Sequence, residues 1–206
     1  MTSHPKDASD ELIRVMAEKS DKIAPFFHLP LQSGSNSVLK RMNRTYTRER
    51  YLSLIEKLRA AIPNIALSTD IIVAFPNETD EDFAQTMDII KSVGFDMVYS
   101  FIYSKRDGTV AARMENNVSD ADKRRRMDEL LTEQAVISHQ KNVPYLNKKV
   151  RVLAEDAKET DNGYVYTGRT DTNKTVHFKS DSDVTGRFVN VLINEIGAFD
   201  LFGEII

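Results

Sequence analysis

The sequence contains no cysteine. This absence excludes disulfides, thiolate zinc sites, iron–sulfur ligation and cysteine nucleophiles from anything that the chain can do alone. No apolar run approaches the roughly 18 residues that a membrane span needs, and the polar, acidic N-terminal segment has the features of neither a signal peptide nor a transit peptide. We therefore expect a cytoplasmic protein. A net charge of −3 gives no global basic field, so any contact with nucleic acid must come from a local patch.

The first two-thirds of the chain alternates between strand and helix patterns. The 206 residues, 41% of them hydrophobic, are enough for one large domain or two modest ones. Apolar runs that favour strands begin near residues 26, 65 and 95, and each is followed by a pattern typical of a helix. Thr47 is a predicted N-cap, and Thr79 with Asp82 has the spacing of a capping box. This rhythm predicts an α/β fold with a parallel sheet or a (β/α) barrel.

The pattern changes after a long helix that we expect over residues 119–142. Pro144 follows this helix, and five short strand patterns occupy the rest of the chain, with a hairpin signal at Asn162-Gly163. Five short strands in about sixty residues are typical of a small all-β barrel of the OB-like kind. We therefore predict two domains, residues 1–143 and residues 144–206.

Polar and small residues follow the predicted parallel strands, and sheets of this kind bind ligands beyond the carboxyl ends of their strands. The segments concerned are residues 3–5, 32–35, 74–78 and 104–108. Their hydroxyls, amides and small side chains suit a polar ligand such as a nucleoside. Ordinary turns between strands and helices have a similar composition, so the composition leaves both interpretations open.

Four titratable side chains stand out in this part of the chain. His4 and His28 could act as catalytic bases or be hydrogen-bonded structural residues. Asp70 lies inside an apolar strand, where a carboxylate needs a hydrogen-bond donor or a ligand. A bond to Thr69 or to a neighbouring strand would satisfy it as well as a ligand would. Glu78 opens a helix, where its charge favours the helix dipole in any case.

Two stretches are rich in cations. Residues 123–126 are expected to form a solvated helix surface. Residues 169–179 interleave cations, hydroxyls, an amide and an aromatic ring, which is the composition most like a nucleic-acid contact in this chain. His177 or Phe178 could stack on a base, although Phe178 could equally be a core residue.

Six segments carry a resemblance to a known family. They are TSHPKD (2–7), HLPLQSGS (28–35), LKRMNRTYT (39–47), TDIIVAFPNET (69–79), FIYSKRDGT (101–109) and TGRTDTNKTVHF (167–178). In this order they resemble the radical S-adenosylmethionine (SAM) methylthiotransferases, and the last is similar to their C-terminal TRAM domain. The resemblance covers essentially the whole chain. It is strongest to the MiaB-type tRNA enzymes, with the threonylcarbamoyladenosine methylthiotransferases as close cousins.

The resemblance implies a fold and a reaction. The fold would be a partial (β/α) radical SAM barrel followed by a small OB-like TRAM barrel. Intact members bind two [4Fe–4S] clusters through cysteines and cleave SAM to a 5′-deoxyadenosyl radical. MiaB-type enzymes methylthiolate C2 of N6-isopentenyladenosine at position 37 of tRNA. Because the cysteines are absent here, we expect a C-terminal fragment that is inactive alone.

The resemblance also implies two sets of site residues. Those at the matching strand ends, which would line the SAM site, are Gln32, Ser33, Asp70, Ile72 and Tyr103. Those of the TRAM segment, which would contact the anticodon stem-loop of tRNA, are Arg169, Thr170, Asn173, Lys174 and His177. No catalytic residue and no metal ligand is predicted in this chain.

Two departures from the family and two other interpretations remain. In the loop at Lys105-Arg106, the family usually has a proline before the arginine or near it. The family usually has glycines at the positions of Ala74 and Asn77, where a Cβ limits close approach of the backbone to a ligand. The chain could instead be a stand-alone RNA-binding protein with the barrel as scaffold, or an unrelated α/β enzyme that uses His4 or Asp70 in acid–base chemistry. A half-barrel would also expose strand edges, so we expect the isolated chain to self-associate.

Overall fold

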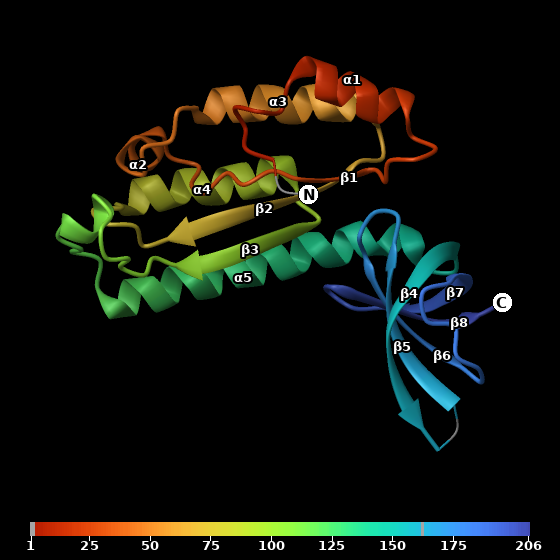
Figure 1. Cartoon of the computed structure of the whole chain (residues 1–206). Coiled ribbons are helices and arrows are strands. Elements are labelled where there is room, and N and C mark those ends of the chain that lie inside the picture. The colour runs from red at the N-terminus through yellow and green to blue at the C-terminus, as the bar shows by residue number, and fades with distance from the viewer. Residues whose placement is uncertain (1–2, 162) are drawn as a thin grey trace. The chain divides into compact units, whose positions relative to one another are not determined.

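The computed structural model describes residues 3–161 and 163–206 of the chain. Their contacts divide into two compact units, Met1–Ile23 with Phe27–Gln134, and Ala24–Phe26 with Ala135–Ile206. Helices and strands alternate in the first unit, whereas a group of strands dominates the second (Figure 1). The long helix α5 (Asp120–Asn142) contributes residues to both units, which agrees with the helix expected over residues 119–142.

A three-stranded sheet with the strand order β1-β2-β3 is the centre of the first unit. Its strands are β1 (Phe26–His28), β2 (Ala66–Val73) and β3 (Met97–Ile102). Strands β2 and β3 are parallel, with Asp70 opposite Tyr99 and Ile72 opposite Phe101. The prediction of a parallel sheet is therefore confirmed.

Four helices precede α5 in the described part of the first unit, and two of them begin at the predicted caps Thr47 and Thr79. They are α1 (Asp10–Glu18), α2 (Asn36–Arg41), α3 (Arg48–Ala61) and α4 (Asp80–Val93), with a 3₁₀ turn, η1, at Ala111–Arg113. The Thr47 side chain caps α3 by accepting from the Arg50 N–H, and Thr79 with Asp82 forms the expected capping box at the start of α4. Gly94 ends α4 with a φ of 58°, a left-handed conformation that glycine adopts without steric cost.

The two faces of this sheet differ in how they are covered. Helices α3 and α4 pack against one face, where the Tyr51 hydroxyl donates to the Leu29 carbonyl at 2.7 Å and Leu54, Leu58, Ile89 and Ile90 are fully buried. On the other face, Tyr99 and Phe101 are 42% and 53% exposed. A sheet with one open face has apolar and polar side chains available to a ligand or to another segment of protein.

The second unit contains a closed barrel with the strand order β4-β5-β6-β8-β7. Its strands are β4 (Lys149–Thr160), β5 (Gly163–Thr170), β6 (Thr175–Ser180), β7 (Phe188–Ile196) and β8 (Asp200–Ile205), after a 3₁₀ turn, η2, at Val143–Tyr145. The five predicted strands and the small barrel are confirmed. Of the predicted hairpin signal, Asn162 lies outside the described residues.

The barrel core consists of inward-facing side chains from all five strands. Its fully buried members are Val152, Ala154, Tyr166, Val176, Val191, Ile193 and Leu201, and Phe178 is 3% exposed. The Phe178 ring stacks on the Tyr166 ring with centroids 5.2 Å apart. The idea that Phe178 stacks on a base is therefore wrong, because its ring fills the core instead.

Candidate functional site

The open face of the sheet carries two of the predicted ligand residues, Asp70 and Ile72. Residues opposite one another in parallel strands point to the same face, so Asp70 and Ile72 share a face with Tyr99 and Phe101. The His28 ring meets Tyr99 edge-on at 5.7 Å between centroids, so His28 lies on this face as well. The face thus combines a carboxylate, an imidazole and two exposed aromatic rings.

His28 is the polar neighbour of the Asp70 carboxylate. Its Nδ1 is 2.8 Å from the Ser68 hydroxyl, and its Nε2 is 3.5 Å from Asp70 Oδ1. Because β1 and β2 are neighbours in the sheet, the imidazole on β1 lies beside Asp70, although no hydrogen bond to the Asp70 side chain is found among the described residues. The Asp70 side chain nevertheless retains 27% exposure, so one side of the carboxylate remains open to a ligand.

The backbone of Gln32 is hydrogen-bonded to β2, the strand that contains Asp70. Its N–H donates to the Asp70 carbonyl at 2.8 Å, and its carbonyl accepts from the Ile72 N–H at 2.9 Å. The φ of Gln32 is 75°, in the left-handed region that non-glycine residues rarely occupy. Backbone strain of this kind is concentrated at functional sites. The structure therefore brings Gln32, Asp70 and Ile72 together.

The other two predicted residues at the strand ends lie differently. The Ser33 side chain is fully buried, and its hydroxyl is 3.3 Å from that of Thr86 in α4, so it points away from the open face. Tyr103 follows β3, where its N–H donates to the Val73 carbonyl and its ring meets Phe75 edge-on at 5.0 Å. The Tyr103 hydroxyl is buried without a hydrogen-bond partner among the described residues.

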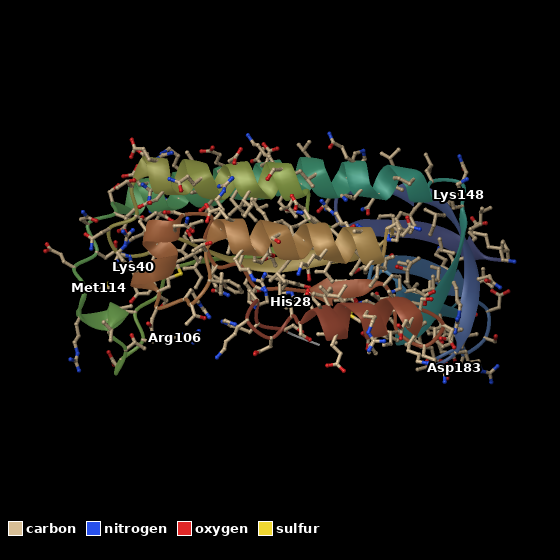
Figure 2. All side chains as sticks on the ribbon, turned by 90° about the horizontal axis from the view of Figure 1, so that it is seen from above. His28, Lys40, Arg106, Met114, Lys148 and Asp183 are labelled. Carbon is tan, nitrogen blue, oxygen red and sulfur yellow. The ribbon has the colours of Figure 1, made fainter. Side chains whose placement is uncertain are left out.

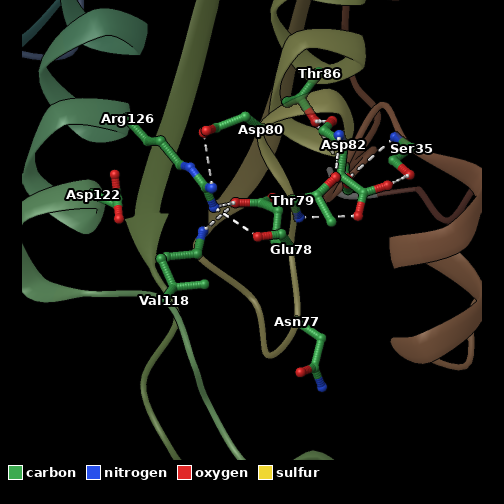
Figure 3. A network of polar contacts seen from close by, with 12 residues as sticks. Ser35, Asn77, Glu78, Thr79, Asp80, Asp82, Thr86, Val118, Asp122 and Arg126 are labelled. Carbon is green, nitrogen blue, oxygen red and sulfur yellow. Dashed lines mark hydrogen bonds and ion pairs between the residues drawn. The ribbon is translucent and has the colours of Figure 1, made fainter.

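The segment after β2 is held by a buried ion pair (Figure 3). Glu78 Oε2 accepts from the Ala74 N–H at 2.7 Å and from Arg126 Nη1 at 2.9 Å, and the two charged side chains are 1% and 5% exposed. Burial raises the pKa of Glu78 above its usual range, although the Ala74 N–H and Arg126 oppose that shift. The expectation that residues 123–126 are all solvated is wrong for Arg126, because it pairs with Glu78.

Two residues of this segment adopt left-handed backbone conformations. The φ angles are 58° at Ala74 and 61° at Asn77. The resemblance implies glycine at both positions, and glycine adopts such angles without steric cost. The Glu78–Arg126 ion pair and the bond from the Ala74 N–H to Glu78 hold the segment in this geometry.

A second polar cluster anchors α2 to α4 (Figure 3). Asp82 accepts hydrogen bonds from the Ser35 and Ser37 hydroxyls, from Arg41 and from the Thr79 N–H. Burial opposes ionisation of this carboxyl, but the hydrogen bonds prevail and lower its pKa to about 2. The segment that contains Gln32 is thereby fixed relative to the segment after β2.

Exposed cations lie at the carboxyl end of the strands. Figure 2 shows Lys40, Arg106 and Met114 toward the same end of the first unit, and the two cations, Lys40 and Arg106, are exposed. Residues 104–108, which the sequence marked as a ligand-type segment, form part of this end. An anionic ligand would meet favourable charge there.

In the second unit, the predicted RNA residues occupy β5, β6 and the turn that joins these strands. Thr170 and Lys174 are buried, with 9% and 6% exposure, and their backbones pair through the Thr170 N–H and the Lys174 carbonyl at 3.0 Å. Asn173 has a φ of 61°. Arg169 Nε is 3.5 Å from a Glu155 carboxylate oxygen, so its charge is partly compensated.

His177 is the most ligand-like member of this set. Its ring stacks on Phe202 with centroids 5.2 Å apart, its Nδ1 is 3.2 Å from the Thr167 hydroxyl, and its Nε2 is 3.7 Å from Asp200. The side chain keeps 33% exposure. The structure therefore brings the five residues to one region of the barrel, but it makes Thr170 and Lys174 parts of the turn rather than open contacts.

The part of the chain that the structure describes contains neither a group of metal-binding residues nor a membrane-spanning helix. Residues 3–161 and 163–206 contain no group of three or more histidine or carboxylate residues that could hold a metal ion. No described helix combines the length and the apolar character needed to cross a membrane.

Comparison with known proteins gives the same two parts. A model of the radical SAM superfamily matches residues 1–90, and a model of the TRAM domain matches residues 144–206. The solved structure of coproporphyrinogen III oxidase from Escherichia coli, described as a radical SAM enzyme, covers 95% of this chain and 46% of its own, with a TM-score of 0.54 and 14% identity. The fold is therefore that of part of a radical SAM domain followed by a TRAM domain.

The relatives in sequence are more specific. The chain is 50% identical over all 206 residues to the tRNA-2-methylthio-N(6)-dimethylallyladenosine synthases of Alkaliphilus oremlandii and Thermoanaerobacter sp., and 44% identical to that of Fusobacterium nucleatum. The chain is therefore similar over its whole length to part of these tRNA-modifying synthases. The chain spans 43% of the length of the first two relatives and 47% of the third.

Proposed function

We propose that the chain forms the C-terminal share of a tRNA-2-methylthio-N6-isopentenyladenosine synthase, which methylthiolates C2 of N6-isopentenyladenosine at position 37 of tRNA. The observation that carries this proposal is 50% identity to such synthases over every residue of the chain. The activity belongs to a protein more than twice as long, so the chain is proposed to contribute walls and contacts to it. We further propose a cytoplasmic location and a domain boundary between residues 143 and 144.

The iron–sulfur clusters of the family do not fit the residues of this chain. A [4Fe–4S] cluster needs cysteine thiolates, and the chain has none. Two such clusters in the intact enzyme would therefore be held by residues outside this sequence. We assign no step through them to the chain.

SAM does fit the open face of the sheet. When bound, it supplies the radical precursor and the methyl group. Asp70 offers a carboxylate to a ribose hydroxyl or to the sulfonium, and Ile72 offers an apolar surface to the adenine. The unpartnered Tyr103 hydroxyl offers a further hydrogen bond, while the strained Gln32 backbone and the buried segment of Ser33 fix the wall of the site.

The TRAM domain is proposed to bind the anticodon stem-loop of the tRNA. Arg169, Asn173 and His177 would contact the RNA, because a partly exposed imidazole and a guanidinium suit bases and phosphates. Thr170 and Lys174 would act through the turn that their backbones close. Under this assignment, the sheet unit lines the SAM site and the barrel binds the tRNA.

Nucleoside analysis of tRNA tests the proposed function. Cells that make the protein are compared with cells in which the coding region for residues 1–206 is deleted in frame. The expected result is loss of 2-methylthio-N6-isopentenyladenosine and accumulation of N6-isopentenyladenosine. Unchanged levels of both nucleosides would contradict the proposal. Loss of a methylthiolated threonylcarbamoyladenosine instead would indicate that the chain is part of a threonylcarbamoyladenosine methylthiotransferase.

A further inference from the structure

A basic and apolar face of the barrel lies outside the predicted RNA residues. Strands β4 and β7 pair with Lys149 opposite Leu192, Arg151 opposite Asn190 and Leu153 opposite Phe188. The residues between these pairs, Val150, Val152, Val189 and Val191, pack into the barrel core. Because side chains alternate along a strand, the three pairs point outward together. We call this set of six residues the Arg151–Phe188 face.

An arginine stacked on an exposed aromatic ring lies at the centre of this face. The Arg151 guanidinium carbon is 3.8 Å from the centroid of the Phe188 ring, and Phe188 is 55% exposed. Leu192 adds a second exposed apolar side chain, with 40% exposure. Within residues 3–161 and 163–206, Arg151 forms no ion pair, so its charge is available to a ligand.

The charge of the face contrasts with that of the predicted RNA residues. Arg169 lies 3.5 Å from Glu155, and His177 lies 3.7 Å from Asp200. The Arg151–Phe188 face contains two cations and no carboxylate. Two carboxylates border the face: Glu204, opposite Leu192, accepts from Asn194 at 3.5 Å, and Glu155 on β4 is 3.5 Å from Arg169. The face therefore has the stronger charge complementarity to a polyanion.

We propose that the Arg151–Phe188 face binds an unpaired nucleotide of RNA, an inference that rests on the proposed function because it places part of the RNA there. A base stacks on the plane of the Arg151 guanidinium or on the open part of the Phe188 ring, while Lys149 meets a phosphate. Asn190 lies opposite Arg151 and offers an amide to the base edge. Proteins that bind single-stranded nucleic acid combine the same two elements, an aromatic platform and adjacent cations.

Binding of a fluorescein-labelled anticodon stem-loop by the full 206-residue chain tests this inference. A blunt RNA duplex of equal charge is measured in parallel. Phe188→Ala should weaken binding to the stem-loop about tenfold and leave binding to the duplex unchanged, because stacking needs an unpaired base. Arg151→Ala should weaken stem-loop binding by a similar factor and reduce the slope of log K against log salt by about one.

Matched variants separate stacking from charge and from folding. Arg151→Lys keeps the charge and should keep the salt slope while losing most of the affinity for the stem-loop. Lys158→Ala removes an exposed cation elsewhere on β4, Phe199→Ala removes a ring outside the face, and each should change binding less than about twofold. Thermal unfolding of all variants checks that the barrel remains folded.

Three results would overturn the inference. If the unsubstituted chain binds the stem-loop and Phe188→Ala and Arg151→Ala bind it equally well, the inference fails while the proposed function stands. If the unsubstituted chain binds no RNA, both the inference and the RNA-binding role proposed for the TRAM domain fail. If both substitutions weaken capture of a protein partner and leave RNA binding unchanged, the face is a protein interface instead.

Discussion

The two units of the chain differ in whether their sheets have unpaired edge strands. In the barrel, every strand has a neighbour on both sides, and the order β4-β5-β6-β8-β7 closes on itself. In the sheet, β1 and β3 are edge strands, and Tyr99 and Phe101 of β3 remain exposed. Closure gives a self-contained unit, whereas an open sheet depends on further protein or ligand to cover it. The barrel therefore has no unpaired strand edge among the described residues, whereas β1 and β3 of the sheet each leave one edge unpaired.

Self-association is the largest effect that this comparison predicts. The exposed edge β3 and its aromatic side chains should make the isolated chain associate as its concentration rises. Light scattering across a concentration series should show a mass above that of the monomer, and Phe101→Lys should lower it. A single monomeric mass at every concentration would contradict the view that the sheet is incomplete.

Removal of Arg126 should destabilise the sheet unit and leave the barrel intact. Arg126→Ala leaves the Glu78 carboxylate buried without its cation, which typically costs about 3–5 kcal/mol. Hydrogen exchange should accelerate in β2 and α4 and remain slow in β7. The control Arg124→Ala, an exposed neighbour, should have an effect within about 0.5 kcal/mol. Equal exchange in β2 for both variants would show that the ion pair is dispensable.

Two buried tyrosines allow the same hydrogen-bond deletion in each unit. Tyr51→Phe removes the bond to the Leu29 carbonyl, and Tyr166→Phe removes bonds to Asp183 and to the Val184 N–H. Each should cost about 1–2 kcal/mol, because a buried polar group loses its partner. Denaturant unfolding monitored by exchange should assign each loss to its own unit. Loss in both units from either change would mean that the units unfold together.

Acid should destabilise the sheet unit through Asp82. Its pKa of about 2 in the folded state lies below the ordinary value of 3.8. The stabilisation is therefore complete above about pH 4 and is lost as the pH falls toward 2. Asp82→Asn should remove this part of the acid sensitivity of the sheet unit. Asp183, whose pKa is also about 2 through bonds from Thr185 and Tyr166, should govern the barrel in the same pH range.

Glycine at position 74 should have the smallest effect. Ala74 has a φ of 58°, and an L-residue pays about 1 kcal/mol or more for that conformation. Ala74→Gly should therefore raise the stability of the sheet unit by about 0.5 kcal/mol after the entropy of the unfolded glycine is subtracted. Asn77→Gly should be nearly neutral, since asparagine tolerates this region well. A clear loss of stability in Ala74→Gly would show that the Cβ makes a contact of its own.

The order of strands and helices could be predicted from the sequence because it depends on local patterns. The capping residues Thr47 and Thr79 and the apolar runs 65–75 and 95–103 need no knowledge of distant contacts. Partners far apart in the chain could not be predicted in this way. Arg126 looks like part of a solvated run, and only the fold brings it 2.9 Å from Glu78, 48 residues away.

In the candidate sites, too, the sequence predicts single residues but not their partners from distant parts of the chain. Periodicity places Asp70 on a strand, but the His28 partner follows from the pairing of β1 with β2. Lys174 has the composition of an RNA contact, yet the turn between β5 and β6 buries it. Arg151 and Phe188 are 37 positions apart in the sequence and meet only through the register of β4 and β7. A search by composition finds single residues such as Asp70 and Lys174, but it misses a pair such as Arg151 and Phe188 that only the fold brings together.

The measurement that tests the account most directly is the ratio of 2-methylthio-N6-isopentenyladenosine to N6-isopentenyladenosine in tRNA from cells that carry point variants of the protein. Asp70→Asn changes the carboxylate on the open face, and Asp128→Asn changes an exposed carboxylate of α5 as a control. The account predicts that the ratio falls strongly in Asp70→Asn at unchanged protein level and stays constant in Asp128→Asn. An unchanged ratio in Asp70→Asn would contradict the assignment of the open sheet face to the nucleoside chemistry.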